Sequence, residues 1–354
     1  MIFVFDYNQN ARMSLTRPIW KLRDWIDINK LDWDYLSRNI YSINILEQNK
    51  DKINWGFLSI NPNAIQLLKE NPEKIDWNML SLNPNAIQLL KENQEKINWN
   101  ILSYNKNAIH LLEENPEKIN WDNLSRNKNA IHLLEENPEK INWDNLSINN
   151  NAFNLFEKYP EKINWNSLSR NIKAINLLER NPDKINWKNL SLNSYAIHLL
   201  ERNQEKIDWD NLCRNKNAIN LLEENQEKIN WNILSINDNA IKLLEINQEK
   251  IDWHILSLNK NAIHLLKKNP EKINWLELSS NENAMELLKD NYIERRNYLD
   301  WYHLTINPSI FELDYEKMRN NNQEMYEDLI KEVMKPSRVF KNPDYDYLEE
   351  LFGD

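Results

Sequence analysis

Four histidines recur at one position of a repeated segment, at x in Ala-Ile-x-Leu-Leu. Three of them have a glutamate three residues later, as Glu113 follows His110, and on a helix this spacing places both side chains on one side, as in some metal sites. That position lies opposite the apolar stripe, and equivalent histidines in adjacent repeats would be about 10 Å apart, too far to share one zinc ion. We therefore expect a solvated face. The histidines are His110, His132, His198 and His264.

Other reactive side chains offer no catalytic arrangement. Paired carboxylates such as Glu113 and Glu114 are adjacent on a helix, where neighbouring positions do not face one another. Cys213 is the single cysteine, so a disulfide framework and a cysteine-based zinc site are excluded. It replaces a serine of the repeat, and no histidine or aspartate is spaced to activate it, so we expect a packed thiol. We expect no enzyme activity, no metal and no cofactor.

Tryptophan and asparagine recur at fixed positions of the repeat, and we call each such set of equivalent positions a column. Stacking platforms for bases or sugars use exposed aromatic side chains. The alternative is that these residues form the structural core, because a repeated unit must also repeat its core. The regular spacing favours the core, with asparagine capping the helix ends. The tryptophans expected in the structural core are Trp77, Trp99, Trp121, Trp143, Trp165, Trp187, Trp209 and Trp231.

The exposed columns vary from one repeat to the next. In solenoids the framework positions repeat, whereas recognition positions vary across one extended face. Drift on a solvated face would produce the same variation, so both interpretations stay open. Arginines recur every 44 residues at a second position, where they could meet an acidic partner. The residues of this candidate protein-binding face are Gln66, Gln88, His110, His132, Asn154, Asn176, His198, Asn220, Arg126, Arg170 and Arg214.

A single repeat organises the chain. Tryptophans lie 22 residues apart from Trp33 to Trp275, and the next one, Trp301, follows after 26 residues. In the unit from Trp55 to Trp77, Asn61 and Pro62 predict a helix start, with asparagine as the N-cap and proline in the first turn. Residues 64–68 form an apolar stripe at helical spacing. Asp76 predicts the cap of a second short helix over residues 77–81.

Helices this short are unstable alone, so each needs neighbours on both sides. The pattern predicts an all-α fold, an α-solenoid of about twelve helical pairs that forms a rod or superhelix. A leucine-rich repeat has a similar period, but its strand needs an apolar residue where this chain often has arginine. We expect an atypical N-terminal cap over residues 1–31, the solenoid over 32–313, and a helical C-terminal tail over 314–354.

The repeat resembles that of a known family. Residues 83–90 read NPNAIQLL and residues 115–121 read NPEKINW, which is similar to the Asn/Trp repeat proteins of giant amoeba-infecting DNA viruses. The lead-in at residues 22–26 and 30–33, and the segment 335–339, are also similar to segments of such proteins. The resemblance implies a viral repeat array that binds proteins, and it brings no catalytic residues.

Composition limits the remaining possibilities. The formal net charge of −10 argues against nucleic acid as the main partner, because a reader of RNA needs a basic groove. No apolar run approaches the ~20 residues of a membrane span, and residues 1–5 do not begin a signal peptide. We expect a cytoplasmic protein that is not secreted, in the host cytoplasm or the virion if viral. Its expected role is a protein-interaction scaffold or adaptor, with a self-assembling structural protein, virion-associated if viral, as the alternative and a nucleic-acid-binding repeat protein as a weaker one.

Overall fold

The computed structural model describes residues 18–295, 297–321 and 331. The chain divides into two compact units. One consists of Met1–Arg23 together with Phe311–Asp354, and the other is Asp24–Ile310. These boundaries differ from the predicted ones, since residues 24–31 belong with the repeats and residues 311–313 do not.

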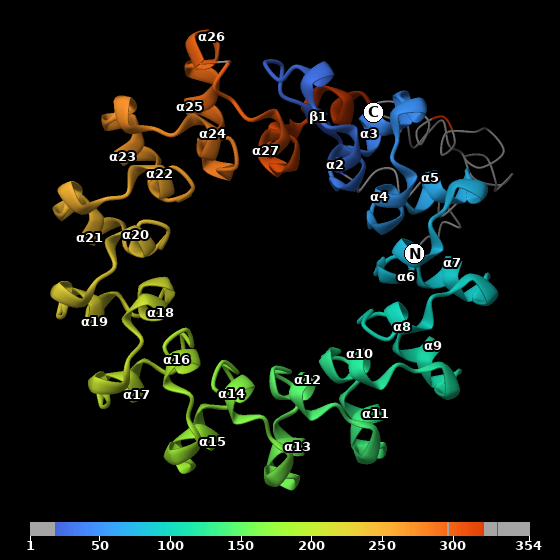
Figure 1. Cartoon of the computed structure of the whole chain (residues 1–354). Helices are drawn as coiled ribbons and strands as arrows, with labels where there is room; N and C mark the ends of the chain where they lie inside the picture. Colours follow the sequence, from blue (N-terminus) through green and yellow to red (C-terminus); the bar gives the residue numbers. More distant parts are fainter. Residues whose placement is uncertain (1–17, 296, 322–330, 332–354) are drawn as a thin grey trace, which may run out of the picture. The chain divides into compact units, whose positions relative to one another are not determined.

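The unit Asp24–Ile310 is an all-α repeat solenoid, as predicted (Figure 1). Each repeat has a first helix that begins at tryptophan, a second helix that usually begins at isoleucine, and a short 3-10 helix. The first helices are α2 (Trp33–Arg38), α4 (Trp55–Ile60), α6 (Trp77–Leu82), α8 (Trp99–Leu102), α10 (Trp121–Arg126), α12 (Trp143–Ser147), α14 (Trp165–Leu168), α16 (Trp187–Leu190), α18 (Trp209–Arg214), α20 (Trp231–Leu234), α22 (Trp253–Leu256), α24 (Trp275–Leu278) and α27 (Trp301–Ile306).

The second helices are α3 (Ile43–Gln48), α5 (Ile65–Lys69), α7 (Ile87–Lys91), α9 (Ile109–Glu113), α11 (Ile131–Glu136), α13 (Phe153–Lys158), α15 (Ile175–Arg180), α17 (Ile197–Glu201), α19 (Ile219–Glu223), α21 (Ile241–Ile246), α23 (Ile263–Lys268) and α25 (Met285–Asp290). Helix α26 (Tyr292–Arg295) accounts for the longer spacing before Trp301. Most of the 3-10 helices, such as η3 (Pro72–Lys74), lead into the next first helix.

The first helices begin where the sequence predicted. The Asp76 carboxylate accepts a hydrogen bond from the Met79 N–H at 3.0 Å, which caps α6. The backbone N–H of Asp76 donates to Ser59 Oγ at 3.0 Å, and the Ser59 hydroxyl donates to the Trp55 carbonyl at 2.7 Å. In most repeats one serine therefore joins a first helix to the start of the next.

The predicted start of the second helix was wrong. Asn61 ends α4, and α5 begins only at Ile65, after Ala64, which makes no side-chain cap. The Asn61 amide donates to the Ser37 and Asn39 carbonyls, at 3.1 and 2.9 Å, in the preceding repeat. Its Oδ1 accepts the Asn63 N–H at 3.0 Å and shapes the loop. This asparagine connects neighbouring repeats because its amide nitrogen bonds to two carbonyls of the preceding repeat.

The apolar part of the fully buried core consists mainly of leucine and alanine. Leu68, Leu80 and Ala64 are 0% exposed, and their counterparts in other repeats are buried in the same way. The predicted tryptophan core requires a correction, because the eight tryptophans named above are half-buried. Most tryptophans of the array carry, over one ring face, a lysine from the end of the same repeat, as Lys96 lies 4.7 Å from the Trp77 ring centroid. An indole is too large for the closely spaced interior, so it packs at the edge of the core.

The repeats close on themselves within this unit. Helix α27 packs against α2, and the Asp32 N–H donates to Thr305 Oγ1 at 3.0 Å, as Asp76 does to Ser59. The Tyr35 and Tyr302 ring centroids are 4.7 Å apart. The sequence predicted a rod or superhelix and did not predict this closure. In this unit α27 takes, relative to α2, the place that the first helix of a preceding repeat would occupy.

The closing repeat is assembled from both ends of the unit. Its first helix is α27, and its 3-10 helix is η1 (Ile28–Lys30), which leads into α2. Lys30 lies 4.9 Å from the Trp301 ring centroid, in the arrangement of Lys52 over Trp33 in an ordinary repeat. Residues 24–31, predicted as part of a separate cap, therefore complete the last repeat.

The unit made of Met1–Arg23 and Phe311–Asp354 contains a two-stranded antiparallel sheet. Strand β1 (Trp20–Leu22) pairs with β2 (Phe311–Leu313), with Lys21 opposite Glu312. The Asp314 N–H extends the pairing by donating to the Ile19 carbonyl at 2.8 Å. The predicted cap and tail thus share one unit. Residues 315–321 are helical, and the rest of the predicted tail, apart from Lys331, lies outside the described residues.

Candidate protein-binding surfaces

The predicted face on the second helices is exposed to solvent. The His110 side chain is 96% exposed, and Gln66 and Gln88 bond only to glutamates of their own helices. His132 does not pair with the glutamate three residues later. Its Nε2 lies 2.7 Å from Glu113 in the preceding repeat, and His198 contacts Glu179 of its own preceding repeat in the same way. Asn154, Asn176 and Asn220 are exposed at the same position.

These histidines link neighbouring repeats without forming a cation site. In the described part of the chain, no group of three or more His, Cys, Asp or Glu side chains could hold a metal ion. Cys213 is buried, and burial is the main cause that raises the pKa of its thiol. The surface is therefore a row of polar side chains, of which His132, His198 and His264 bond to the preceding repeat.

Glu113 provides a pH-dependent prediction. Its pKa is lowered from the ordinary value of 4.5, chiefly by hydrogen bonds from His132 and then His110. A lowered folded-state pKa stabilises the fold above the unfolded value, and the effect disappears as the pH falls through the folded value. An NMR titration should therefore place the Glu113 carboxyl midpoint below 4.5. The His132→Gln substitution should raise that midpoint more than His110→Gln, and an unchanged midpoint in both variants would contradict the assignment.

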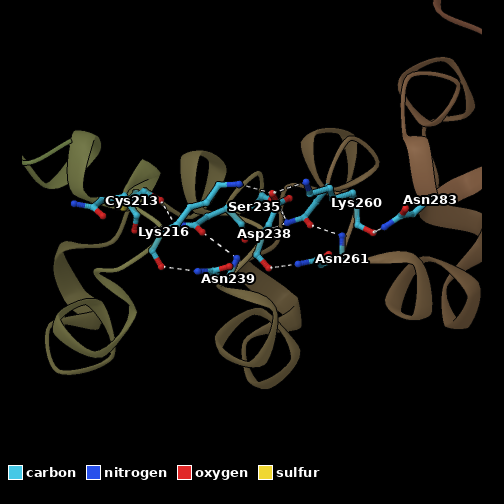
Figure 2. A network of polar contacts seen from close by, with 11 residues as sticks. Cys213, Lys216, Ser235, Asp238, Asn239, Lys260, Asn261 and Asn283 are labelled. Atoms are coloured by element: carbon cyan, nitrogen blue, oxygen red, sulfur yellow. Dashed lines mark hydrogen bonds and ion pairs between the residues drawn. The ribbon is translucent and has the colours of Figure 1, made fainter. Parts of the chain in front are cut away.

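The loops between first and second helices form a second exposed surface. We define the loop surface as the two x positions of Leu-Ser-x-Asn-x in each repeat, for example Ile60 and Pro62. Neighbouring loops are joined by side-chain amides, as Asn239 Nδ2 donates to the Lys216 carbonyl at 2.8 Å and Asn261 Nδ2 to the Asp238 carbonyl at 2.9 Å (Figure 2). These bonds hold the loops of successive repeats side by side.

The loop surface is basic, in contrast to the whole chain. It carries eight cations and two anions, whereas the chain has a net charge of −10. The cations are Arg38, Lys106, Arg126, Lys128, Arg170, Arg214, Lys216 and Lys260, and the anions are Asp238 and Glu282. The three arginines predicted as basic spots therefore belong to a larger basic surface.

Sequence reasoning missed this surface because it followed one column at a time. Arg126 and Lys128 belong to different columns, but they flank the same buried Asn127. The bond from Arg126 Nε to Asn145 Oδ1 at 2.9 Å holds the guanidinium at the surface. Counting the charges on both sides of the asparagine column, repeat by repeat, would have revealed the basic surface from the sequence.

Two hollows lie on the loop surface. One of about 430 Å³ is lined by Ile60, Leu82, Tyr104, Arg126 and neighbouring loop residues. Another of about 540 Å³ is lined by Arg214, Ile236, Leu258, Asp238 and the two lysines beside it. Each hollow spans the loops of four successive repeats. The loop surface thus presents apolar recesses between cationic side chains.

A third hollow of about 1020 Å³ lies where the repeat spacing lengthens. Trp275, Arg295, Tyr298 and Trp301 contribute to its lining. The Arg295 guanidinium lies 5.6 Å from the Trp275 ring centroid, and the buried Arg295 Nε has no hydrogen-bond partner among the residues that the structure describes. The sequence showed the extra residues but gave no sign of a hollow.

No family model, curated protein or solved structure matches the chain. Function must therefore be argued from the geometry. None of the described helices is long and apolar enough to cross a membrane.

Proposed function

We propose that the repeat array is a non-catalytic scaffold that binds proteins. The observation that carries this proposal is that the buried residues of the repeats stay constant while the exposed residues beside them vary. In most repeats the buried asparagine and serine make the same bonds between repeats, as Asn83 donates to the Ser59 and Asn61 carbonyls. The exposed positions beside them change from arginine to isoleucine, tyrosine or lysine without altering the loop. Such a framework supports a variable recognition surface.

The closed arrangement favours a scaffold over a self-assembling structural protein. An open array leaves a first and a last repeat with unpaired faces, which can join end to end. Here the face of α2 is covered by α27 through the Asp32 to Thr305 bond. Nucleic-acid binding by stacking is disfavoured, because lysines cover one face of most tryptophan rings, as Lys118 covers Trp99 at 4.5 Å.

The resemblance to viral Asn/Trp repeat proteins supports a further part of the proposal. We place the protein among viral scaffolds that act in the cytoplasm of an infected cell. The viral assignment depends on the shared motif, whereas the proposed scaffold role does not depend on that motif.

The proposal is tested by cross-linking the full chain in lysate of its source cell. The partners should be identified by mass spectrometry, and each should then be purified and titrated against the chain by calorimetry. We expect at least one saturable, stoichiometric protein partner. Recovery of the chain alone, with a mass that grows with concentration in analytical ultracentrifugation, would support the structural role instead.

A further inference from the structure

The loop surface combines an excess of cations with exposed apolar side chains. We propose that it binds an extended segment of a partner protein in which carboxylates alternate with apolar side chains. The inference rests on the proposed scaffold function and names its surface and the chemistry of its partner. It is carried by charge complementarity, since eight cations and two anions lie on this surface of an acidic chain.

Several cations on this surface are free to meet a partner's carboxylates. Arg38, Lys106, Lys128 and Arg170 are exposed, and none has a carboxylate within 4.0 Å among the described residues. Asp238 lies between Lys216, at 2.6 Å, and Lys260, at 4.0 Å (Figure 2). One carboxylate already bridges two cations from neighbouring loops, which shows the arrangement that an incoming carboxylate would adopt elsewhere on the surface.

Apolar side chains lie between the cations. Tyr104 is 53% exposed, Ile148 is 46% exposed and Ile236 is 44% exposed. With Leu82 and Leu258 they line or separate the two hollows described above. Exposed apolar groups beside charges are typical of protein-binding surfaces, where apolar anchors supply affinity and charges supply specificity. Nucleic-acid backbones have no groups that isoleucine and leucine would recognise, so a peptide is the better match.

The spacing between neighbouring loops suits an extended peptide. Packed helices lie about 8–10 Å apart, and an extended strand rises about 3.3 Å per residue. One repeat therefore corresponds to about three residues of a bound peptide. The hydrogen bonds from asparagine side chains hold neighbouring loops at this spacing before binding, which lowers the entropy lost on association.

The test uses the full chain and a fluorescein-labelled peptide of four Asp-Leu-Glu triplets, followed by fluorescence anisotropy. The triple variant Lys106→Glu, Arg126→Glu, Lys128→Glu should weaken binding at least tenfold. The matched control reverses three exposed lysines elsewhere, Lys188→Glu, Lys267→Glu and Lys268→Glu, with the same change in net charge. Its affinity should stay within twofold of the parent chain. Circular dichroism of both variants checks that the fold is retained.

The apolar contribution is tested separately. Tyr104→Ser together with Ile148→Ser should weaken binding about fivefold, whereas Ile246→Ser, which changes an 80% exposed side chain on a second helix, should not. Equal loss in the loop and control variants would overturn the proposal. Tighter binding of a thymidine oligonucleotide, lost in the same triple variant, would also overturn it and assign the surface to nucleic acid. If no peptide binds but a cross-linked partner is confirmed, this surface is excluded and the scaffold role stands.

Discussion

Replacing Asn83 with alanine should lower the free energy of unfolding by about 3–5 kcal/mol, because three hydrogen bonds are lost and the Ser59 carbonyl loses its Asn83 donor, whereas the Asn61 carbonyl keeps the Ala64 N–H. Asn83 is 0% exposed, and its amide donates to the Ser59 and Asn61 carbonyls, both at 2.9 Å. Its Oδ1 accepts the Asn85 N–H at 3.0 Å. Alanine can neither donate nor accept in these positions. Urea unfolding, followed by circular dichroism and by tryptophan fluorescence, measures the effect.

Asn85 provides the matched control two residues later. It is exposed, and its amide makes a single bond to the Pro62 carbonyl at 2.9 Å. Because water can replace that bond, Asn85→Ala should lower the free energy of unfolding by less than about 1 kcal/mol. Similar losses for the two variants would show that the buried bonds between repeats do not stabilise the array.

The contrast between Asp76 and Asn61 shows how far local sequence patterns can predict this fold. The Asp76 cap was predictable because its donor, the Met79 N–H, lies three residues away. The Asn61 bonds go to residues 24 and 22 positions earlier, and no local pattern reports such a contact. An asparagine before proline resembles a helix start, and the packing of the preceding repeat determined its role instead.

Closure was present in the sequence as two incomplete repeats. Residues 30–33 match the end of a repeat and the next tryptophan without a preceding first helix, and residues 301–308 match the beginning of one. Whether two such halves meet depends on the rotation from each repeat to the next, summed along the array. Small differences in side-chain packing set that rotation, so spacing alone could not predict the contact between α27 and α2.

The second large effect expected concerns this closing contact. In a Cys213→Ser background, cysteines replacing Tyr35 and Tyr302 should be joined within one molecule by a short bismaleimide, because the two tyrosine rings lie 4.7 Å apart. The product should keep the monomer mass, and the link should raise the free energy of unfolding by up to roughly 5 kcal/mol, since it joins positions far apart in the chain. Mass spectrometry of tryptic peptides and urea unfolding measure both effects.

The control pairs Tyr35→Cys with Tyr195→Cys, an exposed position in the repeat that begins with α16. That pair should remain unlinked within the molecule at micromolar concentration. If both pairs react at the same rate, or if Tyr35→Cys with Tyr302→Cys gives only dimers, the array is open in solution. Free end faces would then be available to other copies, and self-assembly would become the better account of the repeats. The closing contact thus decides between a scaffold that ends with its last repeat and one that extends into a polymer.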